Sequence, residues 1–180
     1  MGHTETDLGK VVVNRAMSLD GFIAGPEHEM DWIIAYQSEY SFPEVMASTG
    51  AMLVGRRTYE VSRGMSDEDT DYDGGPVFVL THHPPDEPQP GVTFLSCSLA
   101  EAVSTARAAA AGKNLEILGA DLASQCLRHG FVDEVLVYVL PVLKGDGVHI
   151  SASGLGTIDL EPFSNTQSGP VTMLRYRVRT

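Results

Sequence analysis

The chain has 180 residues, of which 43% are hydrophobic, and it carries a formal net charge of −12 at pH 7. Its length fits a single domain with a sizeable core, and its charge argues against nucleic acid as a partner because binding a phosphate backbone needs a basic face. Its two cysteines stand in no disulfide framework or zinc-ligand spacing, so we predict no metal site and a reducing, cytoplasmic compartment.

The apolar pattern gives no sign of a membrane partner. The longest strongly apolar run, residues 135–143, is far shorter than the roughly 20 residues that span a bilayer. The polar residues 1–9 lack the apolar stretch of a signal peptide. We therefore expect a disordered head over residues 1–9, a single domain over residues 10–180 and no membrane association.

In the first part of the chain, apolar runs alternate with helical patterns. A run of valines predicts a strand buried on both faces at its start. A proline inside the long helical region predicts a break, because proline suits the first turn of a new helix. The predicted elements are a strand at residues 10–18, a loop at 19–26, a helical region at 31–48 with a break at 41–44, a strand at 51–54 and a helix from 56 or 57 to about 62.

The second part begins with an acidic run at residues 67–73, which we interpret as a solvated loop. Ser98 and Glu101 have the spacing of a capping box. The predicted elements are strands at residues 76–81 and 92–95, a helix from 98 to 112, a strand at 115–118, a helix at 121–129, a strand at 132–142, and a hairpin of strands at 156–163 and 171–178 with its turn at 165–170. This order predicts a three-layer α/β/α fold whose mixed sheet is mainly parallel, with an antiparallel C-terminal edge.

Gly55, Arg56, Arg57 and Thr58 directly follow the predicted strand at residues 51–54. A helix that starts there offers unpaired backbone N–H groups and the positive end of its dipole beside two guanidinium groups. Arginine suits a compact phosphomonoester such as the 2′-phosphate of NADPH, because its planar fork donates two parallel hydrogen bonds. The segment is either a phosphate site or a surface turn with two solvated arginines.

Ligands of such sheets collect at the carboxyl ends of the strands. Gly119 stands at one of these ends, before a predicted helix whose first N–H groups can cradle a pyrophosphate. The chain has no GxGxxG, Walker A or GxSxG motif, which argues against a standard Rossmann domain, a P-loop ATPase and an α/β-hydrolase. The strand ends with suitable chemistry are at residues 16–18, 55–58, 80–82 and 119–122.

Motifs at four places follow one another along the chain: MSLDGFIA at residues 17–24, GRRTYE at 55–60, GADL at 119–122, and FVDE at 131–134 leading to PVLKGDG at 141–147. Each motif is loose by itself, but the four in register are specific. Together they resemble the reductase domain of bifunctional riboflavin-biosynthesis proteins and, more broadly, the dihydrofolate reductase-like superfamily. The resemblance covers about residues 10–178.

The resemblance implies that NADPH binds across the strand ends. The loop at residues 20–24, which includes Phe22, would cover the nicotinamide and the substrate. Ala120 stands where the family has its second glycine, so its methyl group would loosen the pyrophosphate fit. By position, the cofactor residues would be Gly55, Arg56, Arg57 and Thr58 at the adenosine-side phosphates, Thr81 and His82 at the adenine ribose, Gly119, Ala120, Asp121 and Leu122 at the pyrophosphate, and Ala16 near the nicotinamide.

Two carboxylates are candidates for catalytic residues. In dihydrofolate reductases an acid on the first helix supports protonation of the pterin, and Asp31, beside Trp32, has that position. A partly buried carboxylate next to an indole can relay a proton, but aspartate at a helix start more often caps the helix, and we favour capping. Asp20 either faces the substrate or closes an Asx-turn in its own loop.

Other candidate residues allow two interpretations each. Lys144 either binds a substrate phosphate, as in the riboflavin reductases, or belongs to a tight turn with the glycines that follow it. His82 and His83 indicate a metal only weakly, because adjacent residues of an extended chain point to opposite sides, and we favour a structural or adenine-stacking role. Cys126 lies in a helical apolar pattern and is interpreted as a small buried residue.

These patterns and the resemblance predict an NADPH-dependent reductase that transfers hydride to a C=N or C=O carbon of a small heterocyclic or sugar-derived substrate. The activity would be similar to that of the 5-amino-6-(5-phosphoribosylamino)uracil reductase of riboflavin biosynthesis. Two alternatives stay open: a dihydrofolate or pterin reductase, which requires Asp31, and a nucleotide-binding module without turnover. The long β-rich run at residues 135–142 favours a homodimer, by strand pairing or sheet packing.

Overall fold

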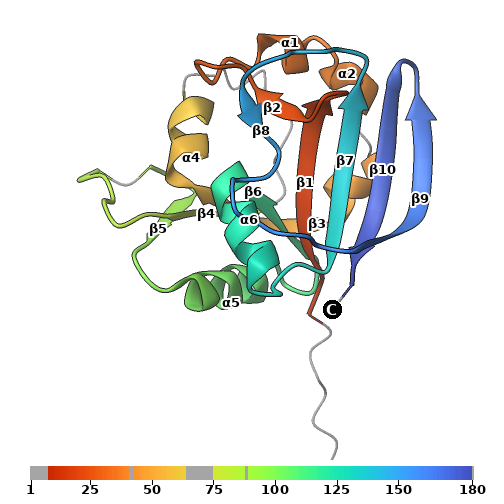
Figure 1. Cartoon of the computed structure of the whole chain (residues 1–180). Coiled ribbons are helices and arrows are strands. Elements are labelled where there is room, and N and C mark those ends of the chain that lie inside the picture. The colour runs from red at the N-terminus through yellow and green to blue at the C-terminus, as the bar shows by residue number, and fades with distance from the viewer. Residues whose placement is uncertain (1–7, 41–42, 64–74, 88, 180) are drawn as a thin grey trace, which may run out of the picture.

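A computed structural model describes residues 8–40, 43–63, 75–87 and 89–179 of the chain. Within these residues, eight strands form one mixed sheet in the order β5-β4-β3-β6-β1-β7-β10-β9, and β2 pairs with β8 in a separate ribbon (Figure 1). The strands are β1 (Val11–Ser18), β2 (Phe22–Ala24), β3 (Thr49–Gly55), β4 (Val77–Leu80), β5 (Val92–Leu95), β6 (Asn114–Leu118), β7 (Glu134–Leu140), β8 (Val148–His149), β9 (Leu160–Ser168) and β10 (Val171–Val178).

The helices connect the parallel strands and leave their carboxyl ends at one edge of the sheet. The capping box predicted at Ser98 is confirmed, because the Ser98 hydroxyl accepts from the Glu101 N–H and the Glu101 carboxylate accepts from the Ser98 N–H. The described helices are α1 (Asp31–Ile34), α2 (Gln37–Tyr40), α3 (Pro43–Ser48), α4 (Arg56–Ser62), α5 (Leu99–Ala109) and α6 (Ala120–Arg128).

The predicted fold class is confirmed. The six strands from β5 to β7 pair in parallel, whereas β10 is antiparallel to β7 and β9 is antiparallel to β10. Strands such as β1 are apolar on both faces at their start because both faces are covered. The β-hairpin at the C-terminus closes one edge of the sheet, as the alternating segments near the C-terminus predicted.

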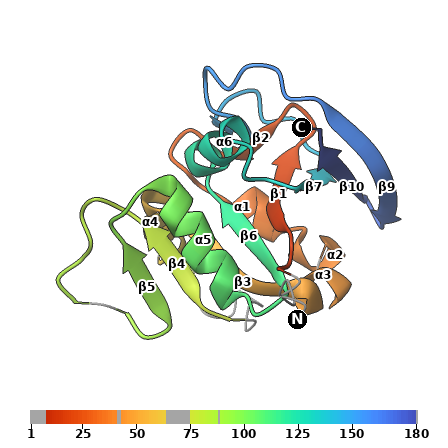
Figure 2. The ribbon, with the colours of Figure 1, turned by 90° about the horizontal axis from the view of Figure 1, so that it is seen from below.

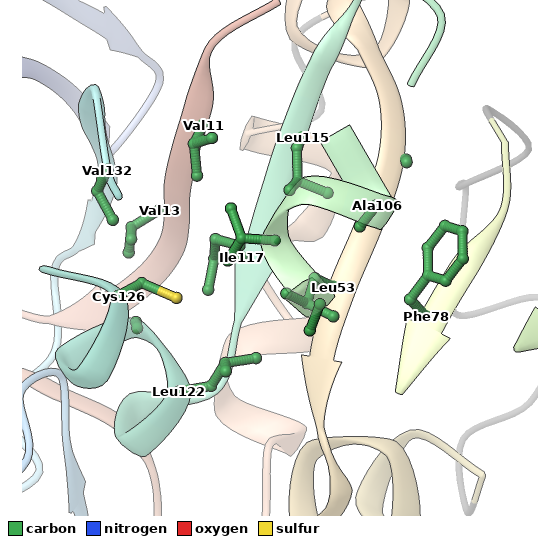
Figure 3. Close-up of a cluster of buried hydrophobic side chains, with 14 of the residues drawn as sticks. Val11, Val13, Leu53, Phe78, Ala106, Leu115, Ile117, Leu122, Cys126 and Val132 are labelled. Carbon is green, nitrogen blue, oxygen red and sulfur yellow. The ribbon is translucent and has the colours of Figure 1, made fainter. Parts of the chain in front are cut away.

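Helices cover both faces of the sheet, as Figure 2 shows in a view from below. On one face, α5 and α6 pack over Leu53, Leu115 and Ile117, which are fully buried (Figure 3). On the other face, α1 to α3 lie over β1, β7 and β10, and α4 lies over β3 and β4. Cys126 on α6 is fully buried in the first cluster, as predicted, and burial raises the pKa of its thiol to about 12.

Some predicted boundaries are wrong. The helical region predicted at residues 31–48 consists of the short helices α1, α2 and α3, and the loop predicted at 19–26 contains β2. The strand predicted at 156–163 is β9, which begins later, at Leu160, and runs on to Ser168, so that only Gly169 and Pro170 form the turn. Most side chains of β9 are exposed and polar, and its second half therefore lacks the apolar alternation that marks a half-buried strand.

Two further expectations concern the ends of the chain and a partner copy. Residues 1–7 and the acidic run lie outside the described residues, whereas the carbonyl of Gly9, expected in the disordered head, accepts a hydrogen bond of 2.8 Å from Arg107 Nε.

The strand β7 lies inside the sheet between β1 and β10. It therefore has no free edge for pairing with a second copy, which excludes the strand-pairing route to the predicted homodimer. A homodimer formed by sheet packing stays a prediction. Among the described helices, none has the length and apolar character to cross a bilayer.

Candidate active site

The carboxyl ends of β3, β4 and β6 meet at a cleft with a volume of about 1060 Å³. One side of the cleft is formed by the first turns of α4 and α6 and by residues 81–83, and the other side by the β2–β8 ribbon and residues 151–153. Every predicted cofactor residue except Ala16 lines this cleft: Gly55, Arg56, Arg57, Thr58, Thr81, His82, Gly119, Ala120, Asp121 and Leu122. The fold thus joins three sequence motifs into one surface.

Two helix N-termini face this cleft. The residues before α4 and α6 are Gly55 and Gly119, and neither helix has a side-chain cap at its N-terminus. The first N–H groups of both helices are therefore left for another acceptor, and the positive ends of two helix dipoles lie at the same place. This arrangement suits an anionic ligand.

Gly119 allows the two helix starts to approach each other. Its φ is +117°, a conformation that side chains of L-residues rarely adopt. A Cβ built at this position would lie 2.9 Å from Thr58 Oγ1 on α4 and 3.8 Å from Leu122 Cβ on α6. Glycine is therefore required here both by the backbone and by the close packing of α6 against α4.

The two predicted phosphate-binding arginines differ in their surroundings. Arg56 Nε lies 2.7 Å from Glu60 Oε1, in an ion pair along one face of α4. Arg57 is exposed and makes no ion pair or hydrogen bond with any residue that the structure describes. Of the two guanidinium groups at this wall of the cleft, that of Arg57 is the one without a carboxylate partner among the described residues.

The residues after β4 form the outer wall of the cleft. Thr81 is buried, its N–H donates to the Leu95 carbonyl over 2.9 Å, and its hydroxyl accepts from the His83 N–H over 3.1 Å. These bonds fix the direction of the chain as it leaves the sheet. The side chains of His82 and His83 are exposed beside the cleft, where an aromatic ring can pack on a flat ligand.

Asp20 holds two loops together. Its carboxylate accepts hydrogen bonds from the Ser18 hydroxyl (2.6 Å), the Lys144 N–H (3.0 Å) and the Gly145 N–H (2.8 Å). The hydroxyl of Ser18 and the backbone N–H of Lys144 are the main causes that lower the pKa of Asp20 from its ordinary value of 3.8 to about 2. We call this set of bonds the Asp20 latch. It joins the loop after β1 to the loop after β7.

Replacing Asp20 by asparagine is expected to remove part of the acid dependence of stability. Because the folded-state pKa lies below the ordinary value, the carboxylate stabilises the fold fully above pH 3.8, and this contribution is lost as the pH falls through about 2. Thermal unfolding of wild type and Asp20→Asn between pH 5 and pH 2 measures it. The difference in melting temperature should shrink towards the acid end, and a constant difference would contradict the latch.

The predicted substrate residues lie outside the lining of the cleft and do not form one group. Lys144 Nζ lies 5.5 Å from the centroid of the Trp32 ring and 3.6 Å from Glu29 Oε1. Trp32 and Ala16 pack against the same apolar cluster on the α1 face. Phe22 instead packs edge-on against His149 in the ribbon, with ring centroids 5.7 Å apart.

Asp31 does not have the environment expected of it. It is the first residue of α1 and its side chain is exposed, so the premise of a partly buried carboxylate is wrong. It is not the N-cap either, since Met30 holds that position, and its charge lies in the first helical turn, where it favours the helix dipole. The structure thus gives no support to a proton relay through Asp31.

The sequence interpretation missed the wall of the cleft that comes from the second part of the chain. His149 on β8 and residues 151–153 line the side facing α4 and α6, beside residues 23–24 of β2, which belong to the loop expected to cover the nicotinamide. The ribbon is formed by pairing Phe22 with His149 and Ala24 with Val148. Strands this short carry no periodic signal, and a single histidine gives no motif, so only the fold brings them to the site.

Comparison with known proteins shows which fold the chain has and to which family it belongs. Dihydrofolate reductase from Enterococcus faecalis, solved in complex with NADP(H), has the same fold, with a TM-score of 0.62 and 14% identity over 96% of this chain and 98% of that chain. The chain therefore has a dihydrofolate reductase-like fold. Residues 9–174 match the model of the RibD C-terminal domain, and the chain belongs to this family.

Two proteins of similar length resemble this chain over nearly its whole length. A Bacillus subtilis (strain 168) protein, the uncharacterized YwjB, is 26% identical over 170 residues, which are 93% of this chain and 97% of YwjB. A Shewanella sp. PV-4 protein, whose name provisionally places it in riboflavin biosynthesis, has a TM-score of 0.78 and 22% identity over 95% of this chain and 99% of that chain.

A longer protein with the same fold is named for two activities, a deaminase and a reductase. The diaminohydroxyphosphoribosylaminopyrimidine deaminase/5-amino-6-(5-phosphoribosylamino)uracil reductase of Thermotoga maritima has a TM-score of 0.69 and 18% identity over 95% of this chain. The match covers 57% of that chain. The sequence-based recognition of the reductase domain is therefore confirmed, and family and fold together support a reductase-like function related to the riboflavin pathway.

Proposed function

We propose that this protein is an NADPH-dependent reductase that transfers hydride to a C=N or C=O carbon of a small heterocyclic or sugar-derived substrate. The observation that carries the proposal is the cleft at the carboxyl ends of β3, β4 and β6, where residues from three separate motifs meet. The dihydrofolate reductase relative was solved with NADP(H), and the Thermotoga maritima relative is named for a uracil reductase activity.

The residues of the cleft fit a dinucleotide phosphate. Two uncapped helix N-termini would receive its phosphates, the one at α6 for the pyrophosphate and the one at α4 for the adenosine side. Arg57 would donate to the 2′-phosphate, since its guanidinium is not engaged by another described residue. Thr81 and His82 would flank the adenine ribose.

The chain's own contribution to the reaction would be orientation and exclusion of water. When bound, NADPH supplies the hydride, so the protein has to hold donor and acceptor carbons in contact. Trp32 and Lys144, which lie together on the α1 face, are the proposed substrate-side residues, and Ala16, packed against the same apolar cluster as Trp32, would lie near the nicotinamide. The Asp20 carboxylate is held by three donors and would keep the loop in place rather than transfer a proton.

A titration with NADPH and, separately, NADH tests the proposal directly. Quenching of Trp32, the single tryptophan, and the nicotinamide emission report binding, and the oxidation of NADPH with aminouracil, pterin and carbonyl compounds reports turnover. Binding of NADPH with turnover on one of these compounds supports the reductase. Binding without turnover on any of them would favour a nucleotide-binding module, and no binding of either nucleotide would overturn both functions.

Replacing Glu60 by glutamine is expected to tighten NADPH binding roughly threefold, because it removes a carboxylate from the cleft wall and frees Arg56. The gain is modest since both side chains are about half exposed, at 54% and 53%. Binding of NADH, which lacks the 2′-phosphate, is the control and should hardly change. Equal gains for both nucleotides would show that Glu60 does not act on the 2′-phosphate.

A further inference from the structure

A buried arginine lies on β1, close to the cleft but outside its lining. Arg15 is 9% exposed, and its Nη2 atom is buried and has no hydrogen-bond partner among the described residues. No carboxylate among the described residues forms an ion pair with it. Burial lowers the pKa of Arg15 to about 10, while the charge of Glu116 opposes this lowering, so the side chain is a cation at neutral pH. Burying a cation without an ion-pair partner lowers the stability of the fold, because the charge loses its hydration.

The position of Arg15 follows from the way that β1 and β6 separate. The pairing of β1 with β6 ends at Val13 and Ile117, whereas the pairing of β1 with β7 continues to Ser18 and Leu140. A gap therefore opens between β1 and β6 towards their carboxyl ends. Two residues beyond the last pair, Arg15 is level with Gly119, the residue that precedes α6.

A hydrogen bond places the guanidinium at this gap. The Lys10 carbonyl accepts from the Leu115 N–H of β6, and the Val11 carbonyl accepts from the Asp133 N–H near β7. Because carbonyls alternate along a strand, the Asn14 carbonyl points to the β6 side, beyond the last paired residue. Arg15 Nη1 donates to this carbonyl over 2.8 Å.

The side chain lies on the same face of the sheet as α6. Odd-numbered residues of β1 share one face, and Figure 3 shows Val13 on that face near Cys126 of α6. The segment after β8 covers this region: the Ile150 N–H donates to the Gly21 carbonyl, and the Ala152 N–H donates to Ser124 Oγ on α6. Ala152 itself lines the cleft. Arg15 is thus enclosed beneath the cleft, beside the start of α6.

We propose that Arg15 is a positioning residue that holds a buried positive charge beneath the cleft, where it attracts the pyrophosphate of a dinucleotide received at the N-terminus of α6. The inference rests on the proposed cofactor site and adds a residue to it. The guanidinium acts through the low-dielectric floor of the cleft, since its free Nη2 atom is buried. Glu116 is bonded on the opposite face of the sheet, to Thr49 and Asn14, and therefore leaves the cleft side of Arg15 uncompensated.

Two ligands, each with one of the two kinds of phosphate group that NADPH has, test the inference. ADP-ribose has the pyrophosphate but no 2′-phosphate, and adenosine 2′-phosphate has the 2′-phosphate but no pyrophosphate. Arg15→Met, which keeps the length of the side chain without its charge, should weaken ADP-ribose binding roughly tenfold and leave adenosine 2′-phosphate binding unchanged. Arg15→Lys, which keeps the charge, should restore most of the ADP-ribose affinity. The affinities are measured by calorimetry on the full chain.

A matched control is Arg107→Met on α5, because Arg107 also donates to a backbone carbonyl, that of Gly9, but lies away from the cleft. It should change neither affinity. A purely structural role of Arg15 would weaken both ligands together, or leave ADP-ribose binding unchanged in a folded Arg15→Met, and either result would overturn the inference. If wild type binds neither ligand, the proposed cofactor site and the inference both fail; if it binds both, the inference can fail by itself.

Discussion

Replacing Arg57 by alanine is expected to weaken NADPH binding about tenfold or more and to leave NADH binding nearly unchanged. A hydrogen bond between a guanidinium and a phosphate contributes about 1.5 to 3 kcal/mol, and about 1.4 kcal/mol corresponds to a factor of ten in affinity. Arg57 has no competing carboxylate among the described residues. The 2′-phosphate is the only group that distinguishes the two nucleotides, so the ratio of their dissociation constants is the measurement.

Arg56→Ala is the matched control for this experiment. Arg56 stands one position earlier on α4 and is engaged by Glu60 through its Nε atom. Its replacement should cost less NADPH affinity than that of Arg57, because part of its guanidinium is already occupied. An equal loss for NADPH and NADH in Arg57→Ala would instead indicate a general distortion of α4, and no loss for either would place the phosphate elsewhere.

Replacing Gly119 by alanine is expected to destabilise the fold by about 1 to 3 kcal/mol and to abolish nucleotide binding. The new methyl group would meet Thr58 Oγ1 at 2.9 Å while the backbone keeps a φ of +117°. We expect this contact to be relieved by movement of α6 away from α4, so that the two helix N-termini no longer face one ligand. Chemical denaturation and a nucleotide titration of the same sample measure both effects.

Gly130 offers a control on the same helix. It follows the C-terminal end of α6 with a φ of +71°, and a Cβ there would meet nothing within 4 Å. Gly130→Ala therefore introduces backbone strain of about 1 kcal/mol without a new contact near the cleft. Nucleotide binding should survive in Gly130→Ala. If Gly119→Ala also bound nucleotide as wild type does, the close approach of the two helices would not be needed for the site.

The sequence was sufficient where a local signal and the tertiary environment agree. The helix start after Gly55, the capping box at Ser98 and the buried valines of β1 each have a local physical cause, and the structure has all three. The meeting of the predicted cofactor residues at one edge of the sheet could also be inferred from sequence, because parallel strands bring their carboxyl ends together. That residues 55–58 lie beside residues 119–122 required the structure, in which β3 pairs with β6.

Other parts needed the three-dimensional structure. The polar end of β9 has no apolar face, and β8 has two residues, so neither carries a periodic signal. The wall at His149 comes from a segment that lies far along the chain from both helix starts. Arg15 was visible as a charged residue within an apolar run, but its meaning depends on the separation of β1 from β6, which is a property of the sheet.

In the Asp20 latch, the carboxylate binds the loop after β7 only through backbone donors, the N–H of Lys144 and the N–H of Gly145. Position 145 favours glycine because its φ is +74°. At position 144, by contrast, any non-proline residue offers the same N–H. The Lys144 side chain lies over the Trp32 ring and makes none of the hydrogen bonds of the Asp20 latch. Under the proposed function, the scaffold would separate anchoring of the loop from ligand choice, and position 144 would be a place to change the substrate preference without rebuilding the loops.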